Sequence, residues 1–461
     1  MSILAGFMVP HPPLIVPAVG RGGEEEIEET TRAYEKIADE IAELKPETII
    51  ITSPHSIMYA DYFHISPGDG AKGSFMSFGA PEVRFNEKYD TELVEAICDL
   101  AHENDFPAGT LGERDRSLDH GTMVPLYFIE KKYRDFRLVR IGLSGQPLTD
   151  HYRLGQMINK AVEQTGRKTV IVASGDLSHK LQDYGPYGYA PEGPEYDRRI
   201  MDVMGRTAFG ELFDFDKNFC DKAAECGHRS FVIMAGAFDG EKVDAEILSH
   251  QDVTGVGYGI GSFRPGEEDE DRHFLEKYLR DSEAEAEEKR NSEDAYVRLA
   301  RQTIERYIRK GEVLPVPEDL PQEMLDTQAG AFVSIHKQGR LRGCIGTIGP
   351  TRDSLAEEII NNAISASTED PRFPAITENE LKLLEINVDV LGEPEYIHSM
   401  DQLDVKRYGV IVTKGYRRGL LLPDLEGVDT PEEQVSIAKR KAGIRDDEDV
   451  KLERFEVIRH T

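Results

Sequence analysis

The sequence predicts an α/β domain followed by a smaller α+β domain. Three observations support this prediction. The 461 residues exceed one ordinary hydrophobic core and suggest about two or three domains. Short apolar runs alternate with helical stretches from Ile3 to about Phe263, and a strongly charged segment, Gly266–Asp294, separates them from a second patterned region. Because strands that alternate with helices form βαβ units, we expect helices to cover the sheet of the first domain.

The elements of the first domain follow from the apolar periodicity. Strands are expected at Ile3–Met8, Thr48–Thr52, Arg137–Leu143 and Thr169–Ala173, and helices at Glu24–Leu44, Asp90–Asn104 and Tyr152–Gln164. The Gly-rich segment between Asp61 and Tyr89 indicates an inserted hairpin. A last apolar, Gly-rich stretch, Thr254–Phe263, is expected to close the domain as an edge strand.

A domain boundary is predicted in the charged segment. Gly266–Asp294 holds thirteen acidic and five basic residues and few large apolar side chains, which is typical of a solvated linker or helix. The predicted domains are residues 1–263 and 295–461, joined by an acidic linker or helix over 264–294. A chain that ends near Pro265 is therefore expected to fold. In the second domain we expect helices at Ala295–Ile308 and Leu355–Ser367, and strands at Gly330–Ile335, Leu384–Leu391 and Gly409–Thr413.

Composition excludes several classes of function. The net charge of −31, from 55 basic and 86 acidic residues, repels phosphates and anionic lipid, so we expect neither nucleic acid nor a membrane surface as a partner. The N-terminus has no basic region, and no apolar run approaches the roughly 18 residues that span a bilayer. We therefore expect a cytoplasmic protein. A disulfide framework, a cysteine-rich zinc site and an iron–sulfur cluster are not expected, because the four cysteines lie unpaired at Cys98, Cys220, Cys226 and Cys344.

Three histidines of the first domain stand where a predicted strand runs into a loop. They are His11, His55 and His179. Ligands of α/β sheets collect at the carboxyl ends of the strands, and imidazole is the commonest metal-ligating side chain. These positions predict a metal or acid/base site at one edge of the sheet, although each histidine alone could be a structural hydrogen-bonding group.

Further polar residues could complete such a site. Glu225, just before an apolar helix, would give two histidines and one carboxylate, an arrangement suited to non-haem Fe(II). Alternatively, Glu225 is only an acidic helix cap. His120 could move a proton near neutral pH, and Asp176 could orient His179 or a neighbouring imidazole.

Over about residues 1–263 the motifs resemble those of class III extradiol ring-cleavage dioxygenases of the LigB type, and especially their Memo-like relatives. The ordered motifs are Val9-Pro10-His11-Pro12-Pro13-Leu14, Ser53-Pro54-His55-Ser56, Asp119-His120-Gly121, Ser174-Gly175-Asp176-Leu177-Ser178-His179 and Glu225-Cys226-Gly227. The resemblance implies the fold of the LigB-type extradiol dioxygenases, a mixed sheet covered by helices. It also implies His11, His55 and Glu225 as Fe(II) ligands, His120 as the acid/base residue, and His179 and Asp176 in the site.

The third ligand is open between two adjacent residues. In the Memo-like branch a cysteine takes the place of the carboxylate, and here Glu225 and Cys226 are neighbours. Successive residues point in different directions, so both are not expected to bind one metal. We favour Glu225. A thiolate ligand would move the site away from ordinary dioxygenase chemistry, and Zn or Cu could also bind.

Residues of about 295–461 resemble the AMMECR domain. The resemblance rests on Leu341-Arg342-Gly343-Cys344-Ile345-Gly346, Asp370-Pro371-Arg372-Phe373-Pro374 and Glu385-Ile386-Asn387-Val388. The joined arrangement resembles the AmmeMemoRadiSam system protein A family, which implies a separate radical-SAM protein as a partner. Cys344 is a catalytic candidate, since Arg340 and Arg342 would favour its thiolate. Alternatively it is a small cysteine in a tight turn.

The predicted function is that of a non-haem Fe(II)-dependent oxidoreductase of the extradiol type, acting on a catechol-like or other metal-chelating small molecule. One alternative is a metal-binding accessory or modifying protein that works with the radical-SAM partner and has no ring-cleavage activity. A metal-dependent hydrolase would need only a metal-activated water. The chain could form a homo-oligomer. Arg372 could bind an anionic group or form a structural salt bridge.

Overall fold

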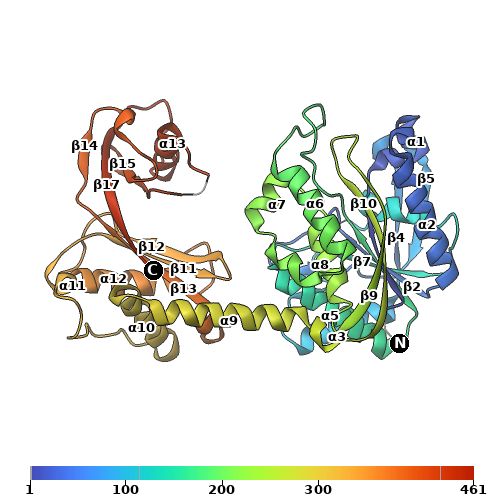
Figure 1. Ribbon diagram of the computed structural model, residues 1–461, viewed down its shortest axis with the longest axis horizontal. Helices are drawn as coiled ribbons and strands as arrows, with labels where there is room; N and C mark the ends of the chain where they lie inside the picture. The colour runs from blue at the N-terminus through green and yellow to red at the C-terminus, as the bar shows by residue number, and fades with distance from the viewer. Residues whose placement is uncertain (1–2, 114, 426) are drawn as a thin grey trace. The chain divides into compact units, whose positions relative to one another are not determined.

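The computed structural model describes residues 3–113, 115–425 and 427–461 (Figure 1). The chain divides into two compact units, Met1–Tyr278 and Leu279–Thr461. Within the described ranges, none of the helices has both the length and the hydropathy that crossing a bilayer requires.

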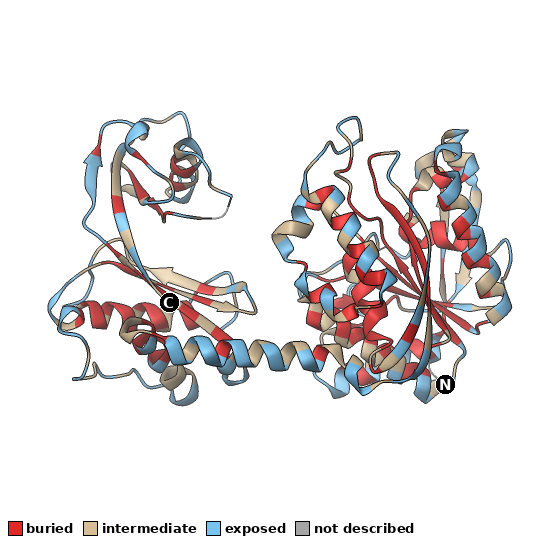
Figure 2. Cartoon of the chain, viewed as in Figure 1, coloured by how far each residue is buried: buried red, intermediate tan, exposed pale blue. Residues whose placement is uncertain are grey.

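A six-stranded mixed sheet forms the centre of the N-terminal unit. Its strands, in spatial order, are β7 (Arg137–Gly142), β2 (Thr48–Ser53), β8 (Thr169–Ser174), β1 (Ala5–Val9), β10 (Tyr258–Glu268) and β9 (Glu241–Gln251). The first four run parallel, and β10 pairs antiparallel with both β1 and β9. β1, β2 and β8 are buried along their whole length (Figure 2), as expected for strands covered on both faces. The predicted mixed α/β sheet is confirmed.

Helices cover both faces of this sheet. On one face α2 (Glu28–Leu44) and α4 (His120–Ile129) share a core with the strand residues Phe7, Val9, Ile49 and Ile51. On the other face α8 (His228–Gly236) lies so close to β1 that a Cβ on Gly6 would meet Met234 Sδ at 2.7 Å. Further helices of this unit are α3 (Thr91–Glu103), α5 (Leu148–Thr165), α6 (Glu192–Gly205) and α7 (Lys217–Ala223).

Two local predictions have different outcomes. The inserted hairpin is confirmed, because β4 (Gly70–Phe75) and β5 (Ala80–Lys88) pair antiparallel. The prediction of an edge strand at Thr254–Phe263 is wrong, since β10 lies between β1 and β9. The strand at that edge is β9, whose many polar and at least partly exposed side chains hide its strand character from an apolar pattern.

The N-terminal unit continues past the end of β10 into the acidic segment. Arg272 Nη2 donates to Thr207 O at 2.9 Å, and His273 Nδ1 lies 2.9 Å from Asp239 Oδ2. Helix α9 (Phe274–Ser292) follows, and its Tyr278 ring lies 4.7 Å from the Phe213 ring. These contacts all lie beyond Pro265.

The C-terminal unit is built on a curled antiparallel sheet of seven strands. Their order is β12 (Arg340–Gly346), β11 (Ala331–Lys337), β13 (Leu384–Leu391), β17 (Lys451–His460), β15 (Tyr408–Lys414) and β16 (Arg417–Leu421), with β14 (Glu395–Ile397) paired to β17. Helices α10 (Ala295–Lys310) and α12 (Leu355–Thr368) share a core with β11 and β13. Helix α13 (Pro431–Lys441) shares another with β15 and β16. The predicted α+β class is confirmed.

We predict that a chain of residues 1–278 folds and is more stable than one of residues 1–265. The shorter chain loses the end of β10, the Arg272 and His273 contacts and the Tyr278 ring, together worth at least about 2 kcal/mol. Urea unfolding followed by circular dichroism measures the difference. Equal unfolding midpoints for the two chains would contradict the assignment of Arg272 to Tyr278 to the N-terminal unit.

Candidate metal centre

His11 follows β1 directly, and its ring is fixed by hydrogen bonds. The residue is 1% exposed. Its backbone nitrogen donates to Asp176 Oδ1 at 2.7 Å. Its ring Nδ1 lies 3.0 Å from Ser174 Oγ, which in turn donates to Gly121 O at 2.6 Å. A hydroxyl has a single proton to donate, so His11 Nδ1 is the donor to Ser174. The lone pair of His11 Nε2 is therefore free for a metal.

His55 follows β2 and points its ring at His11. Its backbone nitrogen donates to Ser53 Oγ at 3.2 Å, and its Nε2 lies 3.0 Å from His11 Nε2. Two metal–nitrogen bonds of about 2.0–2.1 Å that meet at about 90–100° place their nitrogens about 3 Å apart. The separation of the two nitrogens is thus compatible with one shared metal, and it is also that of a hydrogen bond between the two rings.

Cys226 supplies the third nearby donor. It lies in the loop between α7 and α8, with Sγ 3.7 Å from His11 Nε2. The backbone nitrogen of Asp176 donates to the same sulfur at 3.2 Å. The donor atoms of His11, His55 and Cys226 all lie within 4.8 Å of one another. Burial, followed by the charges of Asp176 and Glu225, raises the pKa of the Cys226 thiol well above its usual value.

Glu225 takes a different role from the one that the sequence favoured. Its Oε2 accepts a hydrogen bond of 2.7 Å from the backbone nitrogen of His228, the first residue of α8. Among the described residues, the groups able to hold a metal include Cys226 but not Glu225. In this structure Glu225 thus caps the start of α8, and the geometry favours Cys226 over it as the proposed third ligand. Burial raises the pKa of its carboxyl to about 7.

His120 stands at the N-terminus of α4, beside the two imidazoles. The Asp119 carboxylate that caps this helix accepts from the Thr122 backbone nitrogen at 3.0 Å and from Ser53 Oγ at 2.5 Å. The His120 ring centroid lies 3.9 Å from that of His55 and 5.4 Å from that of His11. Burial, and then these two neighbours, lower the pKa of His120 to about 4. At neutral pH it can accept a proton.

Asp176 lies close to two histidines of the centre. Its Oδ2 lies 3.9 Å from His11 Nε2 and 3.9 Å from His179 Nε2. His179 Nδ1 is bonded to the carbonyl of Ala224, and because a carbonyl only accepts, His179 Nε2 carries its lone pair toward the site. Asp176, His179 and Cys226 form a second group of possible ligands that shares the thiol.

The sequence did not single out the residues that support this centre. Ser53 and Ser174 are buried, are the last residues of β2 and β8, and bond Asp119 and His11 respectively. Their signal was present as a small polar residue at the end of an otherwise apolar strand, close to a candidate histidine.

The remaining candidates belong to the C-terminal unit. Cys344 is on β12. Arg342, expected to favour its thiolate, donates to Glu380 at 3.0 and 3.1 Å, and the catalytic role of Cys344 stays a prediction. Arg372 donates to Asp370 at 2.7 and 2.9 Å, which is the salt bridge named as its alternative role.

Comparison with known proteins adds independent findings. Residues 5–261 match the family model of the catalytic LigB subunit of aromatic ring-opening dioxygenase, and residues 297–460 match that of AMMECR1. A Clostridium acetobutylicum protein is 43% identical over 468 aligned positions, which cover 100% of this chain and 99% of that protein. A Thermotoga maritima protein is 54% identical over 170 aligned positions, which cover 36% of this chain and 98% of that protein. The crystal structure of an uncharacterised Pyrococcus horikoshii protein aligns with 36% of this chain and 88% of that protein's chain. The sequence identity is 36% and the TM-score is 0.34.

We predict that Cys226→Ala weakens metal binding by more than about 100-fold, because loss of a residue that only supports a ligand already costs about 10–100-fold. Glu225→Ala is the matched control. It should keep full metal stoichiometry while the free energy of unfolding falls by about 1 kcal/mol through loss of the helix cap. Titration of the apoprotein with Zn²⁺ and chemical unfolding measure the two effects. The reverse pattern would make Glu225 the ligand.

Metal binding at pH 7 should release about one proton. Burial lowers the pKa of His11 and His55 and raises that of Cys226, so both imidazoles are already neutral and only the thiol loses a proton to the metal. Calorimetry of Zn²⁺ binding in two buffers with different ionisation enthalpies counts the protons. Cys226→Ser should release almost none. A wild-type value near zero would remove Cys226 from the set of ligands.

Proposed function

Because the chain belongs to the LigB family of ring-opening dioxygenase catalytic subunits and carries an AMMECR1 domain, we propose that its N-terminal unit is a Fe(II)-dependent oxidoreductase of the extradiol type. The proposed substrate is a catechol-like small molecule. The observation that carries the proposal is the approach of His11 Nε2 and His55 Nε2 to 3.0 Å, with the Cys226 thiol and the His120 imidazole close to the pair.

The residues of the centre have distinct proposed roles. His11, His55 and Cys226 would hold the metal, and bound Fe(II) supplies the one-electron chemistry that lets a diol react with O₂. His120, which is neutral at pH 7 because burial lowers its pKa to about 4, offers a ring lone pair that takes the proton of a substrate hydroxyl. Asp176 positions the ligands, since it bonds the backbone of His11 and the sulfur of Cys226.

The thiol favours a second candidate function. A thiolate is a softer ligand than a carboxylate and suits Cu(I) and Zn²⁺ as well as iron. Cys226 beside the two imidazoles thus also supports a metal-binding accessory or modifying protein without ring-cleavage activity. In that case we propose that it works with a separate radical-SAM protein.

Oxygen uptake separates the two functions. The full chain is loaded with Fe(II) without air, mixed with a panel of catechols and exposed to O₂. The oxidoreductase proposal requires O₂ uptake that equals the loss of catechol and that stops when the metal is chelated. Tight metal binding without O₂ uptake over the whole panel would support the accessory function instead.

Replacing His120 with Ala should lower any such turnover by about 10²–10⁴-fold while leaving the metal content near normal, because His120 moves protons and is not a ligand. His102→Ala, an exposed histidine on α3, is the control and should keep full activity. The pKa of His120 near 4 also predicts that its protonation causes no loss of rate between pH 8 and 6. Loss of metal in His120→Ala would contradict the assigned role.

A further inference from the structure

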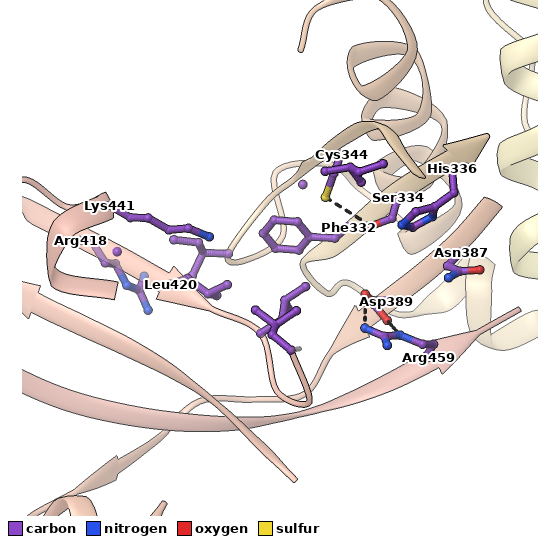
Figure 3. A pocket seen from close by; sticks show the side chains of 16 residues that line it. Phe332, Ser334, His336, Cys344, Asn387, Asp389, Arg418, Leu420, Lys441 and Arg459 are labelled. Atoms are coloured by element: carbon purple, nitrogen blue, oxygen red, sulfur yellow. Dashed lines mark hydrogen bonds and ion pairs between the residues drawn. The ribbon is translucent and has the colours of Figure 1, made fainter. Parts of the chain in front are cut away.

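The C-terminal unit contains a cavity of about 680 Å³, the size of typical small-molecule sites. Its floor is made by every second residue of β11. Val333 and Ile335 pack into the core that β11 shares with α10 and α12, so Phe332, Ser334 and His336 point to the opposite side and line the cavity (Figure 3). The other walls come from β16, the end of α13 and the loop that follows β16.

A row of polar side chains crosses this floor. Cys344, Ser334 and Asn387 are direct partners on the neighbouring strands β12, β11 and β13, and all three line the cavity. Ser334 Oγ donates to Cys344 Sγ at 3.3 Å. The thiol therefore faces the cavity with a hydrogen-bond donor beside it.

The backbone around Cys344 is held from the other side. A Cβ on Gly343 would lie 2.1 Å from Ala366 O, so β12 packs directly against α12 there and only glycine fits. The Cys344 backbone nitrogen donates to Asp370 Oδ2 at 2.9 Å, and Arg372 Nη2 donates to Cys344 O at 3.1 Å. Asp370 and Arg372 thus fix the main chain here, and the Arg372 guanidinium also interacts with the Cys344 side chain.

The lining is cationic although the whole chain is acidic. It includes Arg418, Lys441 and Arg459 against one carboxylate, Asp389, in a chain with a net charge of −31. Asp389 is neutralised by Arg459 Nε at 2.8 Å, and Arg418 lies 3.4 Å from Glu453.

Lys441 is the cation of this lining that remains free to bind an anionic ligand. It makes no ion pair within the described parts of the chain, and Figure 3 shows its side chain extending toward the apolar wall. Lys441 is an exposed residue. Partial burial of its ammonium group lowers its pKa, the Cys344 thiol opposes that shift, and the Arg372 guanidinium adds to it. An uncompensated ammonium group at the wall of an apolar cavity can attract an anion without first breaking a salt bridge.

The other walls suit an apolar body. They consist largely of Phe332, Leu341, Ile348, Leu420, Leu422 and Leu425. We propose that this cavity binds a small organic anion, an aromatic or acyl group that carries a carboxylate or a phosphate, with the anionic group at Lys441 and the Cys344 thiol within reach of the bound molecule. The inference does not depend on the function proposed for the N-terminal unit.

Alkylation of Cys344 in the full chain tests the charge of the site. Iodoacetate and iodoacetamide differ in charge but attack the same thiol, and peptide mass spectrometry gives the rate at each cysteine. We expect the ratio of the iodoacetate rate to the iodoacetamide rate at Cys344 to fall by about tenfold in Lys441→Gln. Arg440→Gln removes the same charge from the neighbouring exposed position of α13 and should leave the ratio unchanged.

Protection experiments identify the ligand. Benzoate or phenyl phosphate should slow alkylation of Cys344 by iodoacetamide. The anion that protects at the lower concentration shows whether the site prefers a carboxylate or a phosphate. Benzyl alcohol, which has the apolar body without the charge, should protect much less.

Four outcomes would overturn the proposal. The first is that neither reagent alkylates Cys344 in the folded chain, and the second is that the ratio of the two alkylation rates falls equally in Lys441→Gln and Arg440→Gln. The third is that benzyl alcohol slows alkylation as much as the anions do, and the fourth is that neither anion slows it. Circular dichroism of each variant checks that the fold is kept. If Lys441→Gln is destabilised, Lys441→Arg replaces it, and because this variant keeps the charge, its ratio of the iodoacetate rate to the iodoacetamide rate should equal that of the wild type.

Discussion

The centre of the N-terminal unit depends on one buried carboxylate. Asp176 accepts from the His11 backbone nitrogen at 2.7 Å, and its own backbone nitrogen donates to Cys226 Sγ at 3.2 Å. It thereby joins the ends of the adjacent strands β1 and β8 to the loop before α8. Burial raises the pKa of this carboxyl, so its ionised form costs stability as the pH rises through that pKa. A cation in the site would offset this cost.

The same burial decides the chemistry of the donors. It keeps His11, His55 and His120 neutral and the Cys226 thiol protonated. The lone pairs of His11 and His55 would thus be available to a metal without competition from protons, and the Cys226 thiol would be the group that loses a proton if it is a ligand. The proposed donor set of two nitrogens and one sulfur is one of two groups that the fold brings together, and the other replaces the two imidazoles with His179 and the Asp176 carboxylate.

Strand alternation organises the C-terminal unit in a similar way. One face of β11, β12 and β13 packs under helices, and the other presents Phe332, Ser334 and Cys344 to a cavity. β17 pairs with β13 through residues 457–460 and with β15 through residues 451–456. This continuity brings α13 and Lys441 to a cavity whose thiol lies about a hundred residues earlier in the chain.

The sequence by itself determined the features that depend on local periodicity. These include the parallel strands, the two-domain class, and the placement of His11 and His55 at strand ends. It could not show that the His228 backbone nitrogen at the start of α8 donates to Glu225, which is the contact that favours Cys226 as the proposed third ligand. Nor could it place β9 at the edge, direct Arg342 to Glu380 or bring Lys441 to Cys344. Those outcomes depend on pairing between distant segments, which only the tertiary structure fixes, because backbone pairing and competing hydrogen-bond donors set the direction of each side chain.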